Sequence, residues 1–299
     1  GGSSDTKLND EAWTVGAKNT NTTFGGVITG ASLTKTGTGA LKLTNANTYS
    51  GATTINSGYL LAMNTTGSAT GTGSVSVANS GVLGGKGFVG GNVTVGANAS
   101  IEPGDPTATN WIDKTGTLTL NKNLTLNGTL HMNVRNGAGY LSDKLVVKGT
   151  TTINGSLILE IVDGASEFAQ DVELTLLDLQ GTVSGAFTSI SLPPTVAGTV
   201  WDTDSLLTTG KIKVVQGTAI MKPDMNESLK IYPNPAKDYL IIEISTTAEV
   251  EICNLSGITV WKKTVSQQEK IDISAIPEGI YFVTVVLNGK RIVEKVLIL

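Results

Sequence analysis

Short apolar runs recur through residues 1–220 of this 299-residue chain, separated by glycine, asparagine, threonine and serine. Within a run every second residue is apolar, which is the period of a half-buried strand. The runs follow one another at roughly 15 to 25 residues, a spacing typical of solenoids. One coil cannot bury its apolar face, whereas stacked coils can, so the recurrence predicts on the order of ten stacked coils. The apolar residues of this pattern are Leu41, Leu43, Leu60, Val75, Val77, Val93, Val95, Leu118 and Leu120.

Glycine and charge divide the chain into two parts. Of the 36 glycines, 33 lie in positions 1–220, whereas 19 charged side chains lie in positions 221–299 against 27 in positions 1–220. The stretch 222–228 is polar, contains Pro223 and lacks apolar periodicity, as linkers do. We therefore expect a solenoid domain in residues 1–221, a linker in 222–228 and a second domain in 229–299.

The second domain has the pattern of a small antiparallel sandwich. Leu240, Ile242 and Ile244 place every second side chain on one face, and Asn288-Gly289 separates two apolar runs, which is a strong hairpin signal. About seven short strands with frequent turns are typical of an immunoglobulin-like β-sandwich.

Four motifs in this domain occur in a specific order. They are Tyr232-Pro233-Asn234-Pro235, the turn Asn254 to Gly257, Pro277-Glu278-Gly279-Ile280-Tyr281, and a basic hairpin at the C-terminus. Together they resemble the type A C-terminal sorting domain of type IX secretion cargo, over nearly the whole of the second domain. The resemblance implies an address that the outer-membrane translocon binds and that a sorting protease removes. The alternative is an ordinary immunoglobulin-like stability domain.

The resemblance also assigns roles within the domain. We expect Gly279 to allow a tight turn into the last hairpin, Tyr281 to anchor that hairpin, and the lysines to face the receptor. The predicted sorting signal is Pro277, Gly279, Tyr281, Lys290 and Lys295, and the predicted motif residues of the domain are Tyr232, Pro233, Asn234, Pro235 and Gly257.

Residues 32–60 are similar to the autotransporter-associated β-strand repeat, and residues 71–105 look like its continuation. The resemblance implies the parallel β-helix of a surface-exposed passenger. The expected fold class is therefore all-β: a right-handed parallel β-helix (solenoid) followed by a small immunoglobulin-like antiparallel β-sandwich. A curved sandwich such as a lectin jelly roll is the alternative for the first domain.

The two ends of the predicted solenoid differ. Residues 140–215 have longer runs, and we expect a cap or distorted last coils there, closed by a hairpin of residues 201–206 and 210–214. Positions 1–30 show no evident cap, so we expect this chain to be the end of a longer protein. No sustained helical periodicity occurs in the first domain, and one short turn at residues 163–170 is the most helix expected.

Residues suited to catalysis are scarce. The single His131 and single Cys253 lie in different predicted domains, so neither a Cys/His dyad nor a zinc site is expected. Alternation points His131 away from the core as a solvated strand residue, and Cys253 is expected to be an inert thiol packed in or near the sandwich. Glu102 and Asp105 are the nearest approach to a carboxylate pair, in a rigid proline corner without clustered basic or aromatic partners, so no catalytic role is expected for them.

The residues available for metal, sugar and nucleic-acid sites can be assessed in the same way. Four aspartates are too widely spread for a calcium site: Asp143, Asp163, Asp171 and Asp178. Four aromatic residues suit either a sugar-stacking surface or packing at the rim of the coils: Trp13, Tyr49, Tyr59 and Trp111. The net charge of -4 and the lack of a basic patch argue against nucleic acid, and no apolar run is long enough to span a membrane.

The scarcity of catalytic residues predicts a non-catalytic protein without metal or cofactor, and the two resemblances imply that it is secreted or attached to the outer-membrane surface after passing through the periplasm. Its stalk or passenger would be carried by the type IX targeting domain, with the translocon and the sorting protease as partners. One alternative is a carbohydrate-binding or adhesive β-helix with a fibronectin-like tail, whose partner is a surface polysaccharide. Another is a fragment of a polysaccharide lyase or hydrolase whose catalytic region lies upstream.

Overall fold

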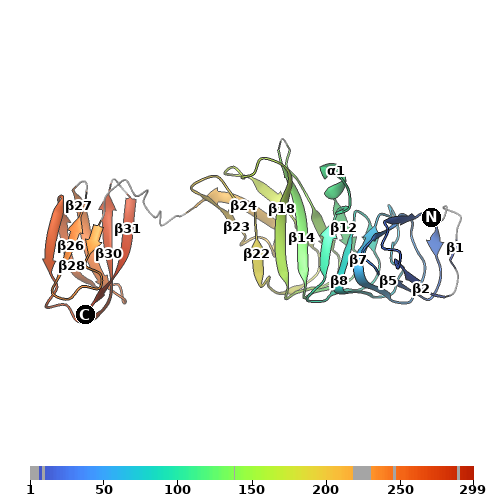
Figure 1. Cartoon of the computed structure of the whole chain (residues 1–299), viewed down its shortest axis with the longest axis horizontal. Coiled ribbons are helices and arrows are strands. Elements are labelled where there is room, and N and C mark those ends of the chain that lie inside the picture. The colour runs from blue at the N-terminus through green and yellow to red at the C-terminus, as the bar shows by residue number, and fades with distance from the viewer. Residues whose placement is uncertain (1–6, 9–10, 138, 218–229, 245–246, 288–289) are drawn as a thin grey trace. The chain divides into compact units, whose positions relative to one another are not determined.

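The computed structural model describes residues 7–8, 11–137, 139–217, 230–244, 247–287 and 290–299 (Figure 1). The chain divides into two compact units, Gly1–Gln216 and Gly217–Leu299. The predicted boundary at residue 221 and the predicted linker 222–228 lie outside the described residues. Among the described residues every regular element is a β-strand except one helix, α1 (Trp111–Lys114), so the all-β prediction is confirmed.

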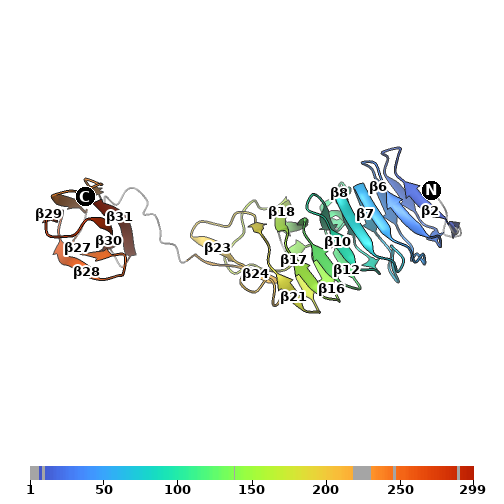
Figure 2. The ribbon, with the colours of Figure 1, turned by 90° about the horizontal axis from the view of Figure 1, so that it is seen from below.

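The first unit is built from stacks of parallel strands, and neighbouring strands of a stack come from successive coils of the chain (Figure 2). Ala12 pairs with Ser32, Leu33 with Thr53, and Thr53 with Val75. The strands of this first stack are β2 (Ala12–Val15), β5 (Ser32–Lys35), β7 (Thr53–Ala62), β8 (Val75–Gly85), β10 (Val93–Val95), β13 (Leu124–Leu126), β17 (Thr151–Ile153) and β21 (Val183–Gly185).

A second stack follows the first around each coil, and the long strands β7 and β8 contribute to both. Ile101 pairs with both Leu83 and Leu130, and Leu130 pairs with Leu157. The other strands of this stack are β3 (Thr22–Phe24), β6 (Ala40–Leu43), β11 (Ser100–Pro103), β14 (Thr129–Asn136), β18 (Ser156–Gly164) and β22 (Ser189–Ser191), and β15 (Leu141–Ser142) adds to β14 antiparallel.

A third stack of parallel strands lies along each coil besides the first two. Strands β1 (Lys7–Leu8) and β4 (Val27–Ile28) pair at one end, and β9 (Phe88–Val89), β12 (Thr117–Leu120), β16 (Lys144–Val147) and β20 (Leu177–Leu179) pair at the other. Between the two groups, backbone hydrogen bonds continue the stack, from Thr48 N to Ile28 O (3.0 Å) and from Ala69 N to Phe88 O (2.9 Å).

The coils lengthen along the chain. The coil from Val75 to its partner Val93 is short, whereas the coil from Thr151 to its partner Val183 is nearly twice as long. The first stack has eight strands in the described residues, which is of the expected order of ten coils, and insertions enlarge the later coils. One insertion, after Pro103, holds α1, which the sequence pattern did not predict; its N-cap is Asn110. The turn expected at residues 163–170 is not helical.

Alternation within the strands directs the apolar side chains inward. The inner row of the first stack includes Ile55, Val77, Val95 and Leu126, all buried and all part of one hydrophobic cluster. The nine apolar residues that defined the sequence pattern belong to the same buried cluster. This burial removes apolar surface that no single coil could cover by itself.

Asparagine side chains connect neighbouring coils at their corners. The buried Asn47 accepts the N–H of Ile28 (2.7 Å) from one coil and donates to the carbonyl oxygen of Ala69 (2.6 Å) in another. Asn123 accepts the N–H of Thr150 (2.9 Å) in the same way. The carboxamide carries both a donor and an acceptor, so it satisfies backbone groups where strand pairing is interrupted.

The C-terminal end of the first unit is closed by an antiparallel sheet of β19 (Glu173–Thr175), β24 (Lys211–Gln216) and β23 (Thr199–Asp202). The ring of Trp201 lies edge-on to that of the buried Phe168 at 5.0 Å, and its Nε1 donates to Pro193 O (2.8 Å). Strands β23 and β24 form the hairpin expected from residues 201–214.

The second unit contains two antiparallel sheets. One is β25 (Lys230–Tyr232), β26 (Tyr239–Glu243) and β29 (Gln268–Asp272), and the other is β28 (Thr259–Val265), β27 (Ala248–Asn254), β30 (Gly279–Leu287) and β31 (Lys290–Ile298). Leu240, Ile242 and Ile252 are buried in one cluster of side chains from both sheets. Leu287 pairs with Lys290, as a hairpin around Asn288-Gly289 requires, although those two residues lie outside the described ones.

Candidate functional site

The proline motif of the second unit is attached to the C-terminal strand. The Asn234 side chain donates from Nδ2 to Lys295 O (2.8 Å) and accepts the N–H of Leu297 (3.0 Å) at Oδ1. Ala236 N donates to Leu297 O (2.7 Å), and Leu299 N donates to Ala236 O (2.8 Å). Two motifs far apart in the sequence therefore form one structure, in which the Asn234 carboxamide pairs with β31 as a peptide group would. The Tyr232-Pro233 and Asn234-Pro235 peptide bonds are cis.

The Pro277 to Tyr281 motif begins strand β30. Tyr281 is buried, and its hydroxyl donates to Pro277 O (2.8 Å), so the ring anchors the turn that leads into the last hairpin. Gly279 has φ +153°, at the margin of the region that side chains disfavour, while a Cβ there would meet only the Tyr281 ring at 3.8 Å. The backbone angle, rather than lack of space, favours glycine at this position.

The two predicted lysines lie at different positions along β31. Lys295 is exposed and lies opposite Phe282, near the Tyr281 and Asn234 contacts. Lys290 begins the strand opposite Leu287, and its side chain lies outside the described ones. Five residues of extended strand correspond to about 17 Å, so the predicted sorting residues lie along the last hairpin rather than in one cluster.

The turn containing Gly257 is held by hydrogen bonds centred on Asn254. Its Oδ1 accepts the N–H groups of Ser256 (3.0 Å) and Ile258 (2.9 Å), and its backbone oxygen accepts that of Gly257 (2.9 Å). Gly257 adopts φ +75°, which explains glycine here. Ile258 is exposed and lies just before strand β28.

In the first unit, Glu102, His131 and Glu160 lie in a row across three neighbouring strands. His131 Nδ1 lies 3.6 Å from Glu102 Oε1, and Nε2 lies 3.0 Å from Glu160 Oε2. The Glu102 carboxylate raises the pKa of His131, and Glu160 adds to this effect while burial opposes it. His131 does point away from the buried Leu130 and Met132, but it is half-buried between carboxylates rather than freely solvated.

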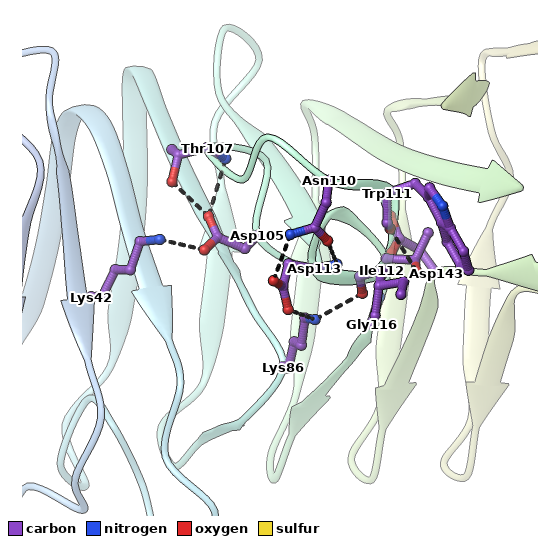
Figure 3. A network of polar contacts seen from close by, with 11 residues as sticks. Lys42, Lys86, Asp105, Thr107, Asn110, Trp111, Ile112, Asp113, Gly116 and Asp143 are labelled. Carbon is purple, nitrogen blue, oxygen red and sulfur yellow. Dashed lines mark hydrogen bonds and ion pairs between the residues drawn. The ribbon is translucent and has the colours of Figure 1, made fainter. Parts of the chain in front are cut away.

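The carboxylates of Glu102 and Asp105 serve different contacts, and Figure 3 shows those of Asp105. Asp105 is buried, forms an ion pair with Lys42 and accepts the N–H (3.1 Å) and hydroxyl (2.6 Å) of Thr107. Glu102 instead contacts His131 and accepts the Ser100 hydroxyl (3.0 Å). Lys42 reaches Asp105 from a much earlier strand of the chain and is a single basic partner rather than a cluster.

Asp143 fastens the insertion that carries α1. Its Oδ1 accepts the N–H of Gly116 (2.8 Å; Figure 3). Its Oδ2 accepts the backbone N–H (2.7 Å) and a side-chain Nδ2–H (3.2 Å) of Asn133. The carboxyl group is fully buried, and burial raises its pKa to about 8 against the effect of these donors. Nearby, Lys86 pairs with Asp113 (3.2 Å) on α1.

The four widely spread aspartates make separate contacts: Asp163 pairs with Arg135, Asp171 with Lys213, and Asp178 with Lys144, while Asp143 is buried. Among the residues that the structure describes, no three His, Cys, Asp or Glu side chains gather in a way that could hold a metal ion. Cys253 is half-buried, with its sulfur 3.8 Å from the Thr259 hydroxyl.

The aromatic residues do not form one surface. Tyr49 is buried and its hydroxyl bonds to that of Thr53 (2.6 Å); burial raises its pKa to about 12. Trp111 has the guanidinium of Arg135 over its ring at 4.3 Å. Tyr49 is therefore excluded from a sugar-stacking surface, and Trp111 already has a cation on one face.

The pairing of Asn234 with β31 and the buried Asp143 were not found by sequence reasoning. The motif around Asn234 was recognised, but its partner lies near the other end of the domain sequence. Asp143 lies in Leu141-Ser142-Asp143-Lys144, where the surrounding residue types give no signal of burial.

Comparison with known families confirms both resemblances. Residues 230–299 match the family described as the secretion system C-terminal sorting domain, and residues 33–62 match the passenger-associated-transport-repeat. A repeat region of type IX secretion cargo is thus followed by a sorting tail, and such a tail belongs to proteins that are secreted or displayed at the cell surface. In the described residues, α1 is far too short to cross a membrane.

A stretch of 73 residues is 37% identical to Beta-agarase D of Zobellia galactanivorans. It covers 24% of this chain and 15% of that protein, so most of the agarase has no counterpart in the alignment.

Proposed function

We propose that this chain is a non-catalytic passenger carried to the cell exterior by its type IX sorting tail. The observation that carries this proposal is the match of residues 230–299 to the sorting domain, within a unit that has its own hydrophobic core. The chain passes through the periplasm, its tail is bound by the outer-membrane translocon, and a sorting protease removes the tail. The cargo is then released or attached to the outer-membrane surface.

In this proposal the first unit is a right-handed parallel β-helix that serves as a stalk or passenger. Three stacks of parallel strands met in the same order by successive coils support it. Crossovers between parallel strands of one sheet are right-handed in nearly all proteins, which supports the handedness.

Export of the full chain tests the sorting role. The chain with a periplasmic leader is produced in a host with type IX secretion, beside a version that ends at residue 216. Cell fractionation gives the location of each version, and mass spectrometry gives its mass. We expect the full chain outside the outer membrane without its tail, and the shortened chain in the periplasm. Equal location of the two versions would contradict the proposal. Gly279→Ala and Lys290→Ala test the signal residues, and unchanged export of both would remove them from the signal.

A carbohydrate-binding passenger is a second candidate, and the row of Glu102, His131 and Glu160 favours it. Carboxylate and imidazole groups on one outer surface offer hydrogen-bond partners for sugar hydroxyls. Reproducible binding of the full chain to a glycan array, lost in His131→Ala, would support this function. Activity of the chain on agar or another polysaccharide would instead support a third candidate, a fragment of a polysaccharide-degrading enzyme. The similarity to the agarase gives this candidate little support, because it covers only 15% of that protein.

A further inference from the structure

Strand β31 is an edge strand among the described residues, which cover only part of its free edge. It pairs with β30 on one side, and Asn234 and Ala236 pair with its last residues on the other. These contacts show which backbone groups point away from β30: the carbonyl oxygens of Lys295 and Leu297 and the N–H groups of Leu297 and Leu299.

The same alternation identifies the outward-pointing backbone groups in the rest of the strand. Backbone groups that point to one side recur at every second residue, so the N–H and C=O groups of Val293 and Arg291 also point away from β30. Within the part of the chain that the structure describes, no backbone group pairs with them. A row of unpaired donors and acceptors of this kind is a template for a further strand.

The other edge of the same sheet is protected. In β28, a bulge at Val260 interrupts the pairing, since Ile252 pairs with Trp261 while Cys253 pairs with Thr259. Lys262 and Lys263 on that strand are exposed and form ion pairs. A bulge and charged side chains are the usual protections against strand addition. The β31 edge has no bulge in its pairing with β30.

Charge indicates what kind of strand fits. The sequence of β31 contains Lys290, Arg291 and Lys295 against the single acidic Glu294. Two copies of this basic edge repel one another, so pairing between copies of the chain is disfavoured, whereas an acidic segment is attracted.

We propose that the edge of β31 at Arg291 and Val293 is a docking site where an extended, acidic segment of the secretion machinery adds as a further strand. Main-chain hydrogen bonds supply the affinity in this mode of recognition, and side chains supply the specificity. The added strand ends where Asn234 takes over the edge, so the proline motif sets the limit of the site. The inference rests on the proposed sorting function and names the surface that the partner binds.

Val293→Pro tests the backbone contact. Proline removes the outward N–H, and edge positions whose N–H faces away from the sheet are where strands tolerate it. Export of the full chain is compared with wild type in a type IX host, and circular dichroism with a thermal melt verifies that the purified variant is folded. We expect export to fall by about tenfold in a folded protein, as for the loss of one to two hydrogen bonds at an interface.

A charge reversal provides a second test that does not depend on proline. Lys290→Glu combined with Arg291→Glu should reduce export, while Lys262→Glu combined with Lys263→Glu on β28 makes the same charge change and should not. If the Lys290→Glu/Arg291→Glu variant and the folded Val293→Pro variant are both exported as well as the wild-type chain, the inference is overturned. Reduced export of Val293→Pro alone would retain strand addition and overturn the acidic partner. Failure of the wild-type chain itself to leave the periplasm would instead contradict the sorting function.

Discussion

Asp143 is a buried carboxyl group whose contacts are all N–H donors, from Gly116 and Asn133. Burial without a directly paired cation disfavours the charged form, while the donors favour it. Its pKa is raised to about 8, because burial outweighs the hydrogen bonds. The group thus secures the α1 insertion and makes the stability of the unit depend on pH.

The sign of this dependence is fixed by the direction of the shift. The folded pKa of Asp143 lies above that of the unfolded chain, so between about pH 4 and pH 8 the unfolded state releases a proton that the folded state keeps. The free energy of unfolding should therefore fall as pH rises through this window. In Asp143→Asn that contribution should vanish, while the free energy of unfolding at pH 5 falls by about 1–3 kcal/mol because one N–H loses its acceptor. Urea unfolding at several pH values measures both effects.

Asp178→Asn is the matched control for this prediction. Asp178 is partly exposed and pairs with Lys144 at 3.4 Å near the surface, so its removal should change the free energy of unfolding by less than about 1 kcal/mol. If the free energy of unfolding falls with pH as much in Asp143→Asn as in the wild type, another group causes the pH dependence.

At the scale of the element, the corners of the coils depend on glycine. Gly58 lies where β7 turns from the first stack to the second, with φ +62°. A Cβ at this position would lie 2.4 Å from Gly37 O and 2.6 Å from Gly39 O, atoms of the neighbouring coil. Close stacking of the coils and a left-handed backbone therefore both require glycine here.

Gly58→Ala and Gly139→Ala separate these two requirements. Gly139 has φ +74°, but a Cβ there would have no atom within 4 Å, so alanine should cost only the left-handed backbone, about 1–2 kcal/mol. Gly58→Ala should lower the free energy of unfolding of the first unit by more, because the neighbouring coil must also move. Chemical denaturation of both variants compares them, and equal losses would mean that the coils adjust without cost.

Elements were more predictable than their connections. Alternation marked Leu41, Val75 and Val93 as inward-facing because the period of two is local in the sequence. The length of each coil was not predictable in the same way, since an insertion after Pro103 lengthens a coil without changing any strand.

Lys35 also escaped prediction. It occupies an inner-row position and donates to Thr36 O (2.7 Å), Gly37 O (2.9 Å) and Ser57 O (3.2 Å). Ser57 belongs to the next coil, so this group of carbonyl oxygens exists only once the coils have stacked. A sequence pattern that is read one strand at a time therefore cannot show why a lysine is buried there.

The candidate site shows the same limit. The order of four motifs identified the sorting tail, because each motif is a local turn or strand start. What the motifs do to one another depends on contacts across the sandwich, such as those between Asn234 and β31. Local chemistry predicts that asparagine suits a turn, but not that its carboxamide replaces a peptide group at a sheet edge.

At the scale of the whole molecule, the two units have separate hydrophobic cores with no residue in common. The first unit is a series of stacked coils whose contacts lie between neighbours, and the second is a small sandwich. Because neither core contributes to the other, each unit should unfold with its own transition. This independence fits the proposed carriage of a passenger by a sorting tail.

Differential scanning calorimetry of the full chain tests the independence of the two units. Leu60→Ala and Ile252→Ala each remove a fully buried side chain, one from each core, and each should cost about 2–5 kcal/mol. Leu60→Ala should lower the transition of the first unit alone, and Ile252→Ala that of the second alone. Because the second unit is smaller, the same loss should shift its midpoint roughly twice as far. A double variant should show both shifts unchanged, since distant sites are additive, and a single transition shifted by either substitution would show that the units unfold as one.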